Sequence, residues 1–166
     1  MVATTMENAE IGENDRRSEA AEIISSAVKW SAAAGVLPLP FVDLIALGTV
    51  QYKMIRNLSK LYEMDGDKKD IETIVSTTLG MLAPSFLSTN LVGSSLKLFP
   101  GAGTFLGSAS VAAFSAAATY SIGKIFIRHF ENGGTIKNFS AESIQEELKD
   151  EFANASGKVE PKKKPV

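Results

Sequence analysis

The chain has 166 residues, of which 45% are hydrophobic and 22% are charged, and its formal net charge is −2. This balance gives no basic surface for nucleic acid, so we expect no nucleic-acid partner. The absence of cysteine excludes disulfide bonds, thiol catalysis and thiolate metal sites. The polar, acidic N-terminus has no apolar run of the kind found in secretory signals, so we expect the soluble parts in the cytoplasm.

The first predicted elements are a polar tail and a helix. Residues 1–17 show no apolar periodicity, and we expect them to be disordered. A helix is expected to begin at Ser18, which suits an N-cap, and to end at Gly35. Its apolar stripe, expected to be buried, consists of Ile23, Ile24, Ala27, Val28 and either Trp30 or Ser31.

A second helix follows a connector that contains Pro38 and Pro40 and begins at Pro40 or Phe41. Asp43 falls in its first turn, where the helix dipole favours a negative charge. Apolar residues recur at three- and four-residue steps for about six turns, which predicts an amphipathic helix. These apolar positions are Phe41, Leu44, Ile45, Leu47, Met54, Ile55, Leu58 and Leu61. The residues expected to face a partner are Gln51, Lys53, Arg56 and Lys60.

The longest uncharged feature spans residues 74–123, in which Lys97 carries the only formal charge. Each half has roughly 20–26 residues, enough for a helix to cross a hydrocarbon core of about 30 Å. The halves are separated by a turn built from Pro100, Gly101 and Gly103. We therefore expect an apolar helical hairpin, rich in Gly, Ala and Ser.

The first hairpin helix should begin near Asp67 or Lys68, and Pro84 should kink or split it. A charged helix is predicted over residues 139–154, and residues 155–166 are expected to be a disordered tail. No strand signal carries weight. The sequence therefore predicts an all-α chain: one helical domain over residues 18–132, made of the amphipathic helix pair and the hairpin, followed by the charged C-terminal helix.

Two interpretations of the hairpin stay open. Its many Ser, Thr and Gly residues suit the core of a soluble helical oligomer. Its small residues at four-residue spacing also suit close packing of membrane-embedded helices or of two copies: Gly103, Gly107, Ala112 and Ala116. Apart from Lys97 at the apex, the lysines and arginines lie outside the two ends of the hairpin. The positive-inside rule then places both termini in the cytoplasm.

No set of residues with catalytic spacing occurs in the sequence. The glycines between residues 101 and 107 do not match a dinucleotide-binding fingerprint, because the third comes one residue late and no βαβ unit surrounds them. There is no phosphate-binding GxxxxGK[ST] loop, and the single histidine, His129, is expected to serve a helix C-terminus. We therefore expect neither enzymatic activity nor a cofactor or metal.

Three features together resemble a known family. They are the two prolines with Asp43, the helix face from Gln51 to Leu58 with Tyr62 beyond it, and the Pro-Gly-x-Gly turn at 100–103. Over about residues 20–131 the chain is similar to the GTPase-associated, YcjF-like domain of unknown function. This resemblance implies a helical, membrane-associated domain. Since the chain contains no GTPase domain, it also implies that any small GTPase acts in trans, and it names no catalytic residue.

The predicted function is that of a non-enzymatic, membrane-associated helical module that self-associates and docks a cytoplasmic partner. The expected partners are membrane lipid, a second copy of the chain and a small GTPase in trans. The alternative is a soluble homo-oligomeric scaffold or assembly protein, which would bury its Ala, Ser and Gly faces between protomers.

Overall fold

The computed structural model describes the backbone of residues 2–35, 42–64, 66–92 and 102–159. Within these ranges, side chains are not described for residues 2–11, 42–44, 85–92, 102–110 and 158–159. The described residues form five helices and no strand, which confirms the all-α prediction. The helices are α1 (Val2–Ala34), α2 (Val42–Leu61), α3 (Lys68–Val92), α4 (Ala102–Glu131) and α5 (Gln145–Val159).

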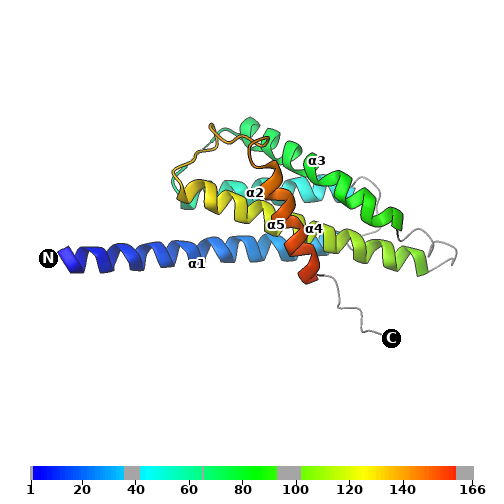
Figure 1. Ribbon diagram of the computed structural model, residues 1–166, viewed down its shortest axis with the longest axis horizontal. Coiled ribbons are helices and arrows are strands. Elements are labelled where there is room, and N and C mark those ends of the chain that lie inside the picture. Colours follow the sequence, from blue (N-terminus) through cyan, green and yellow to red (C-terminus); the bar gives the residue numbers. More distant parts are fainter. Residues whose placement is uncertain (1, 36–41, 65, 93–101, 160–166) are drawn as a thin grey trace.

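Helix α1 departs from the prediction at its N-terminal end. It begins at Val2, so the expectation that residues 1–17 are disordered is wrong: this segment supplies the first half of α1. Its second half is anchored on α4, and a helix extends readily from an existing turn. The ion pair between Glu13 and Arg17, spaced i,i+4 with atoms 2.8 Å apart, also favours the extension. Figure 1 shows this half of α1 projecting past the other helices.

Helix α4 lies at the centre of the bundle and contacts each of the other four helices. α1 runs antiparallel to α4, because Arg17 contacts Glu131 at one end while Gly35 contacts Ala112 at the other. α2 runs parallel to α4, and α3 returns antiparallel to α2 after a short turn. α5 crosses α4 steeply (Figure 1). The C-terminus of α1, the start of α2 and the N-terminal part of α4 therefore meet at one end.

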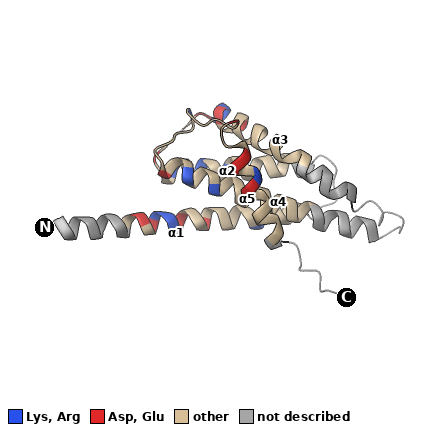
Figure 2. Cartoon of the chain, in the orientation of Figure 1, with Lys and Arg blue, Asp and Glu red and all other residues tan. Residues whose placement is uncertain are grey.

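Charge is distributed unevenly along this bundle, as Figure 2 shows. The described part of α4 carries no charged residue before Lys124, and α1 carries none after Lys29. We call the three uncharged segments that meet here the charge-free end; they are residues 30–35, 45–52 and 111–119. The opposite part, where α1 and α2 contact the last turns of α4, is called the charged end. The two ends differ in polarity even though they share one core.

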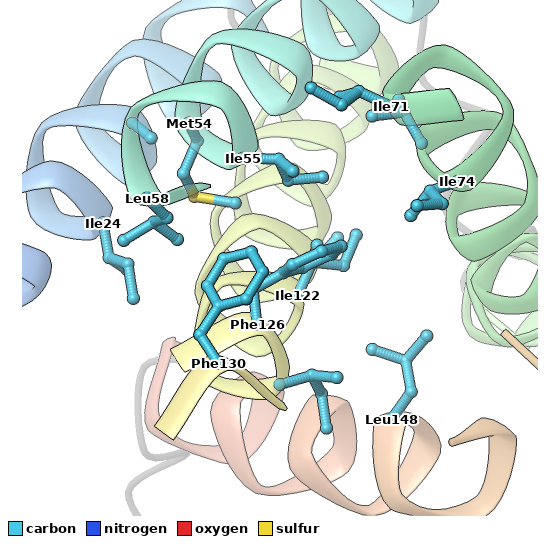
Figure 3. Close-up of a cluster of buried hydrophobic side chains, with 14 of the residues drawn as sticks. Ile24, Met54, Ile55, Leu58, Ile71, Ile74, Ile122, Phe126, Phe130 and Leu148 are labelled. Atoms are coloured by element: carbon cyan, nitrogen blue, oxygen red, sulfur yellow. The ribbon is translucent and has the colours of Figure 1, made fainter. Parts of the chain in front are cut away.

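All five helices contribute to that core (Figure 3). Phe126 of α4 is fully buried and stacks on Phe139, with ring centroids 4.5 Å apart. Burying side chains of this size stabilises the fold by about 1.5–3 kcal/mol each. Residues from both halves of the predicted hairpin join the same core, among them Ile74, Leu82 and Ile122. The described part of the hairpin is therefore packed inside the bundle by the other helices.

Pro84 was predicted to kink or split its helix; α3 passes through Pro84 without a break, so the split is wrong. A proline inside a helix removes the hydrogen bond to the carbonyl four residues earlier, here that of Gly80. Both residues are exposed, and Gly80 has open space around it. Water can therefore hydrate the carbonyl, which lowers the cost of keeping Pro84 within one helix.

The C-terminal helix is shifted relative to its predicted position. α5 begins at Gln145, and turns occupy residues 141–144. It continues to Val159, so residues 155–159, expected to be part of a disordered tail, are helical; residues 160–166 lie outside the described part. The extension follows from one buried stripe at i, i+4 and i+7. That stripe consists of Leu148, Phe152 and Ala155.

Candidate interaction surface

Helix α2 presents three of the four residues predicted to face a partner. Lys53, Arg56 and Lys60 are exposed, but Gln51 is fully buried, so its placement on the partner face was wrong. The buried stripe of α2 includes Leu47 and Leu58 and repeats at helical spacing, and position 51 falls on the same stripe. Polarity suggested a surface residue, whereas the helical period places this glutamine in the core.

Gln51 is held in a hydrogen-bonded cluster that joins three helices. Its Nε2 donates to Thr119 Oγ1 of α4 at 2.8 Å. Thr119 Oγ1 lies 2.7 Å from both the Ser115 carbonyl oxygen and Ser31 Oγ of α1. A carbonyl can only accept, so Thr119 donates to Ser115, and Ser31 in turn donates to Thr119. Gln51 Oε1 is buried without a partner among the described residues, and burying this acceptor costs free energy. The cluster therefore fixes which residues of the three helices meet, at some cost in stability.

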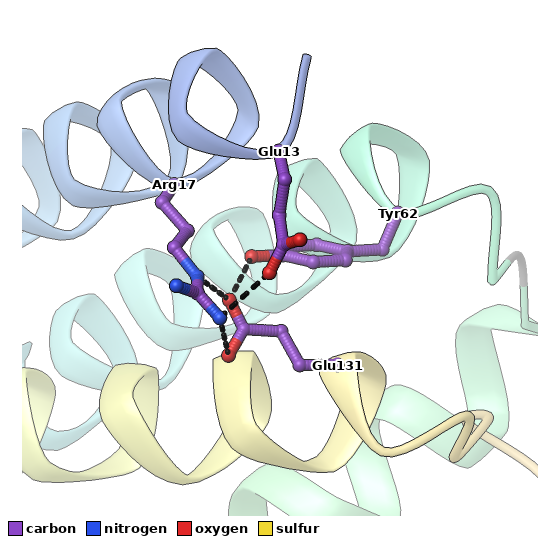
Figure 4. A network of polar contacts seen from close by, with 4 residues as sticks. All are labelled: Glu13, Arg17, Tyr62 and Glu131. Atoms are coloured by element: carbon purple, nitrogen blue, oxygen red, sulfur yellow. Dashed lines mark hydrogen bonds and ion pairs between the residues drawn. The ribbon is translucent and has the colours of Figure 1, made fainter. Parts of the chain in front are cut away.

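The charged end is linked by a network around Glu131 (Figure 4). Arg17 Nε of α1 donates to Glu131 Oε1 at 2.8 Å, and the hydroxyl of Tyr62, the residue that follows α2, donates to the same oxygen at 3.3 Å. Burial raises the pKa of Tyr62 to about 12, with the charge of Glu131 and its hydrogen bond adding to the effect. Hydrogen bonding to Glu131 likewise raises the pKa of Arg17. One carboxylate therefore connects three helices.

A second link at the charged end fastens α5 to α4. Arg128 pairs with Glu147 at 2.8 Å and with Glu151 at 2.9 Å. Because Arg128 is 44% exposed, each of these pairs contributes little, and the buried face of α5 supplies most of the attachment.

The charge-free end exposes two large apolar side chains. Trp30 is 69% exposed and Ile45 is 73% exposed; Ile45 was expected on a buried stripe, and of the two residues predicted for the stripe of α1, Trp30 or Ser31, the structure buries Ser31. In α1 the core position is taken by Ser31, which turns Trp30 outward by one helical step. Beside Trp30 a groove of about 600 Å³ runs between α1 and α2. Its walls are Glu19, Glu22, Ile23, Ser26, Ala27, Trp30, Thr49, Val50, Lys53, Met54 and Asn57.

The small residues predicted to pack helices fall into two groups. Ala116 is buried, and Ala112 lies so close to α1 that a Cβ added to Gly35 would sit 2.8 Å from its backbone nitrogen. Gly103 and Gly107 belong to α4, but their surroundings lie outside the described part. The use of these positions between copies of the chain stays a prediction.

The remaining predicted positions concern turns. Pro38, Pro40, Pro100 and Gly101 lie outside the described residues. Asp43 is in the first turn of α2, as the sequence predicts, but its side chain is not described.

Two kinds of feature are absent from the described residues. Among these residues no group of three or more His, Asp or Glu side chains could hold a metal ion. Within the described part of the chain, no helix is both long enough and apolar enough to cross a membrane.

The fold and its surface define a class: an all-α domain in which one central helix is enclosed by four others, with one polar end and one charge-free end. The chain belongs to the family described as a domain of unknown function (DUF697), whose model matches residues 5–157. This is the family of GTPase-linked, YcjF-like proteins to which the sequence features pointed.

One relative carries a descriptive name. Magnetosome membrane protein 22 of Magnetospirillum gryphiswaldense is 32% identical over 133 residues, which cover 80% of this chain and 68% of the relative. No solved structure matches the chain.

Proposed function

We propose that this protein is a non-enzymatic, membrane-associated helical module that self-associates and docks a cytoplasmic partner. The observation that carries the proposal is the division of charge along the bundle, with exposed Trp30 and Ile45 at the charge-free end. The uncharged segments 30–35, 45–52 and 111–119 can approach lipid without dehydrating an ion of their own, which would be costly. The name of the magnetosome membrane relative supports the same conclusion.

The partner surface that we propose is the exposed basic stripe of α2. Lys53, Arg56 and Lys60 are separated by three and four residues and therefore lie along one side of the helix. Family membership makes a small GTPase in trans our proposed partner. Reversing two charges, Arg56→Glu with Lys60→Glu, should abolish binding of a purified small GTPase. The same reversal on α3, Lys68→Glu with Lys69→Glu, should leave binding intact.

Membrane association is tested by fractionating cells that express the tagged chain. We expect the protein in the membrane pellet at low salt, and washes with carbonate and then detergent separate peripheral from integral attachment. Recovery in the supernatant at low salt would refute membrane association.

Self-association is tested by its proposed helix contact. Gly107→Leu should weaken association, because a bulky side chain keeps helices apart at a small-residue contact. The matched control is Gly157→Leu on α5, where the structure leaves open space. Equal association of both variants would remove the small-residue contact from the proposal.

A soluble homo-oligomeric scaffold is the second candidate. One observation favours it: the described parts of α3 and α4 are packed by other helices of the same chain, as the burial of Leu82 and Ala118 illustrates. A single large, defined mass in a detergent-free preparation would support the scaffold. A monomer that floats with vesicles would support the membrane module.

A further inference from the structure

We propose that the charge-free end seats in the interface of an anionic membrane, with Trp30 as its aromatic anchor and Lys29, Lys53 and Lys124 on the lipid phosphates. This inference rests on the membrane association proposed above. It adds which end meets the lipid, how the bundle stands on the surface and which headgroup chemistry it prefers.

Among the charged residues whose side chains are described, the three lysines are the first met on their helices from the charge-free end. Lys29 directly precedes Trp30 in α1, Lys53 is the first charged residue of α2 after Asp43 in its first turn, and Lys124 is the first charged residue of described α4. On α3 the charges lie within the first five residues, whereas α5, whose Phe152 packs against Phe114, carries charges along most of its described length. These three lysines, which we call the lysine ring, border the uncharged segments of α1, α2 and α4.

The lysines also lie at nearly the same height along the bundle. Lys53 and Lys124 each adjoin the contact in which Met54 approaches Gly123. Lys29 is two residues from Ser31, whose partner Thr119 lies four residues from Gly123. At 1.5 Å per residue, these contacts and the contact of Ile24 with Gly123 place the three positions within about 5–9 Å, or one to two helical turns. Such a ring fits one layer of lipid phosphates.

The charges of this ring are available to a ligand. None of the three lysines forms an ion pair with another described residue, whereas Arg17 and Arg128 at the charged end are both paired. Lys29 and Lys53 are exposed, and Lys124 is half-buried. Glu22 of α1 is two turns away from Lys29, at about 10 Å, and it lines with Glu19 the groove that Lys53 also lines, without an ion pair to Lys53. Anionic phosphates would supply the missing counter-charges, each worth about fivefold in membrane affinity.

The exposed apolar side chains lie on the uncharged side of the lysine ring. Trp30 lines the groove that Lys53 also lines, and Ile45 lies one turn before Thr49 on the same face of α2. Tryptophan favours the boundary between headgroups and acyl chains, because its ring is apolar and its N–H remains solvated. The order along the bundle, apolar rim and then lysines, matches the order of acyl chain and phosphate in a lipid leaflet.

Tryptophan emission tests this placement directly, because Trp30 is the only tryptophan of the chain. The full chain is mixed with vesicles of phosphatidylcholine containing the anionic lipid phosphatidylglycerol. We expect a blue shift of emission and quenching by lipids with brominated acyl chains, with weaker binding to phosphatidylcholine alone. Vesicle flotation measures binding independently of Trp30.

The two measurements separate the two proposals. Flotation without a blue shift or quenching would overturn the seating of Trp30 while membrane association stands. Failure to float would overturn both. A blue shift that depends on protein concentration, and appears without vesicles, would assign the charge-free end to a contact between copies and overturn the lipid seat.

Matched charge variants test the lysine ring. The triple variant Lys29→Gln, Lys53→Gln and Lys124→Gln should weaken vesicle binding by about a hundredfold in total. The control changes net charge equally at the charged end, with Lys60→Gln, Lys68→Gln and Lys69→Gln, and should lose much less. Equal losses would show that binding follows net charge alone and would overturn the ring.

Discussion

The two ends of the bundle are joined by opposite means. At the charged end long side chains bridge the helices, with Arg17 and Tyr62 both reaching Glu131. At the charge-free end the side chains that link the helices through Thr119 are shorter and buried, and α1 touches α4 directly because Gly35 has no side chain to hold it away from Ala112. Long polar side chains tolerate a shift between helices, whereas direct backbone contact does not. The charge-free end should therefore be more sensitive to small changes in volume.

The largest effect on stability should come from the core beneath the charged end. Phe126→Ala removes a fully buried ring that stacks on Phe139 and should lower the free energy of unfolding by about 3–5 kcal/mol. Ile45→Ala, at the charge-free end, should cost less than about 0.5 kcal/mol because that side chain is exposed. Chemical denaturation of both variants measures the contrast. A large loss for Ile45→Ala would indicate that it is buried in solution.

Added volume should be costly at the charge-free end. Gly35→Ala places a Cβ 2.8 Å from the backbone of Ala112, so α1 and α4 must move apart, at about 1–3 kcal/mol. Gly48→Ala in α2 meets open space and should stabilise the helix by up to about 1 kcal/mol. Thermal unfolding followed by circular dichroism compares the two. Similar stabilisation by both alanines would contradict the direct helix contact.

The buried hydroxyl cluster gives an asymmetric pair of substitutions. Thr119→Val leaves the Gln51 amide and the Ser31 hydroxyl without their shared partner and should cost about 1–3 kcal/mol. Gln51→Leu removes the amide donor together with the unpartnered Oε1, so the free energy of unfolding should change little. Equilibrium denaturation measures both variants. The reverse order would show that Oε1 is hydrogen-bonded in solution.

The smallest effect concerns pH at the charged end. Tyr62 has a pKa of about 12 when folded, above the ordinary value of 10.0, so folding favours its protonated form. The contribution of Tyr62 to the free energy of unfolding is fully present below about pH 10 and is lost as the pH rises towards about 12. Tyr62→Phe should show a shallower loss of stability over that range in denaturation experiments. Parallel curves for the two proteins would contradict the raised pKa.

The sequence predicted the helical architecture because regular spacing encodes which residues lie together on a helix. It did not predict the rotation of α1, since Ile23 and Trp30 compete with Ile24 and Ser31 for the buried side. The partners of Ser31 decide this rotation, and Thr119 lies 88 residues away in the chain. Spacing within one helix holds no information about such a contact.

The same limit explains Gln51 and the N-terminal segment. The polarity of Gln51 indicated exposure, whereas its position on the stripe with Leu47 and Leu58 indicated burial, and only Thr119 resolves the conflict. The polar residues before Arg17 lack an apolar stripe and give no local reason to fold. Their helix depends on an anchor to α4 that forms only in the assembled bundle.

The projection of α1 has a geometrical consequence for a bundle seated on lipid. Its 33 residues make a rod about 50 Å long, whose C-terminal end lies at the charge-free end. Since α1 then points away from the surface, its first turns stand several Debye lengths above the headgroups, where the membrane's own charge is screened. α1 would hold its N-terminal end away from the membrane, so a partner that recognises this end would bind it in bulk solvent.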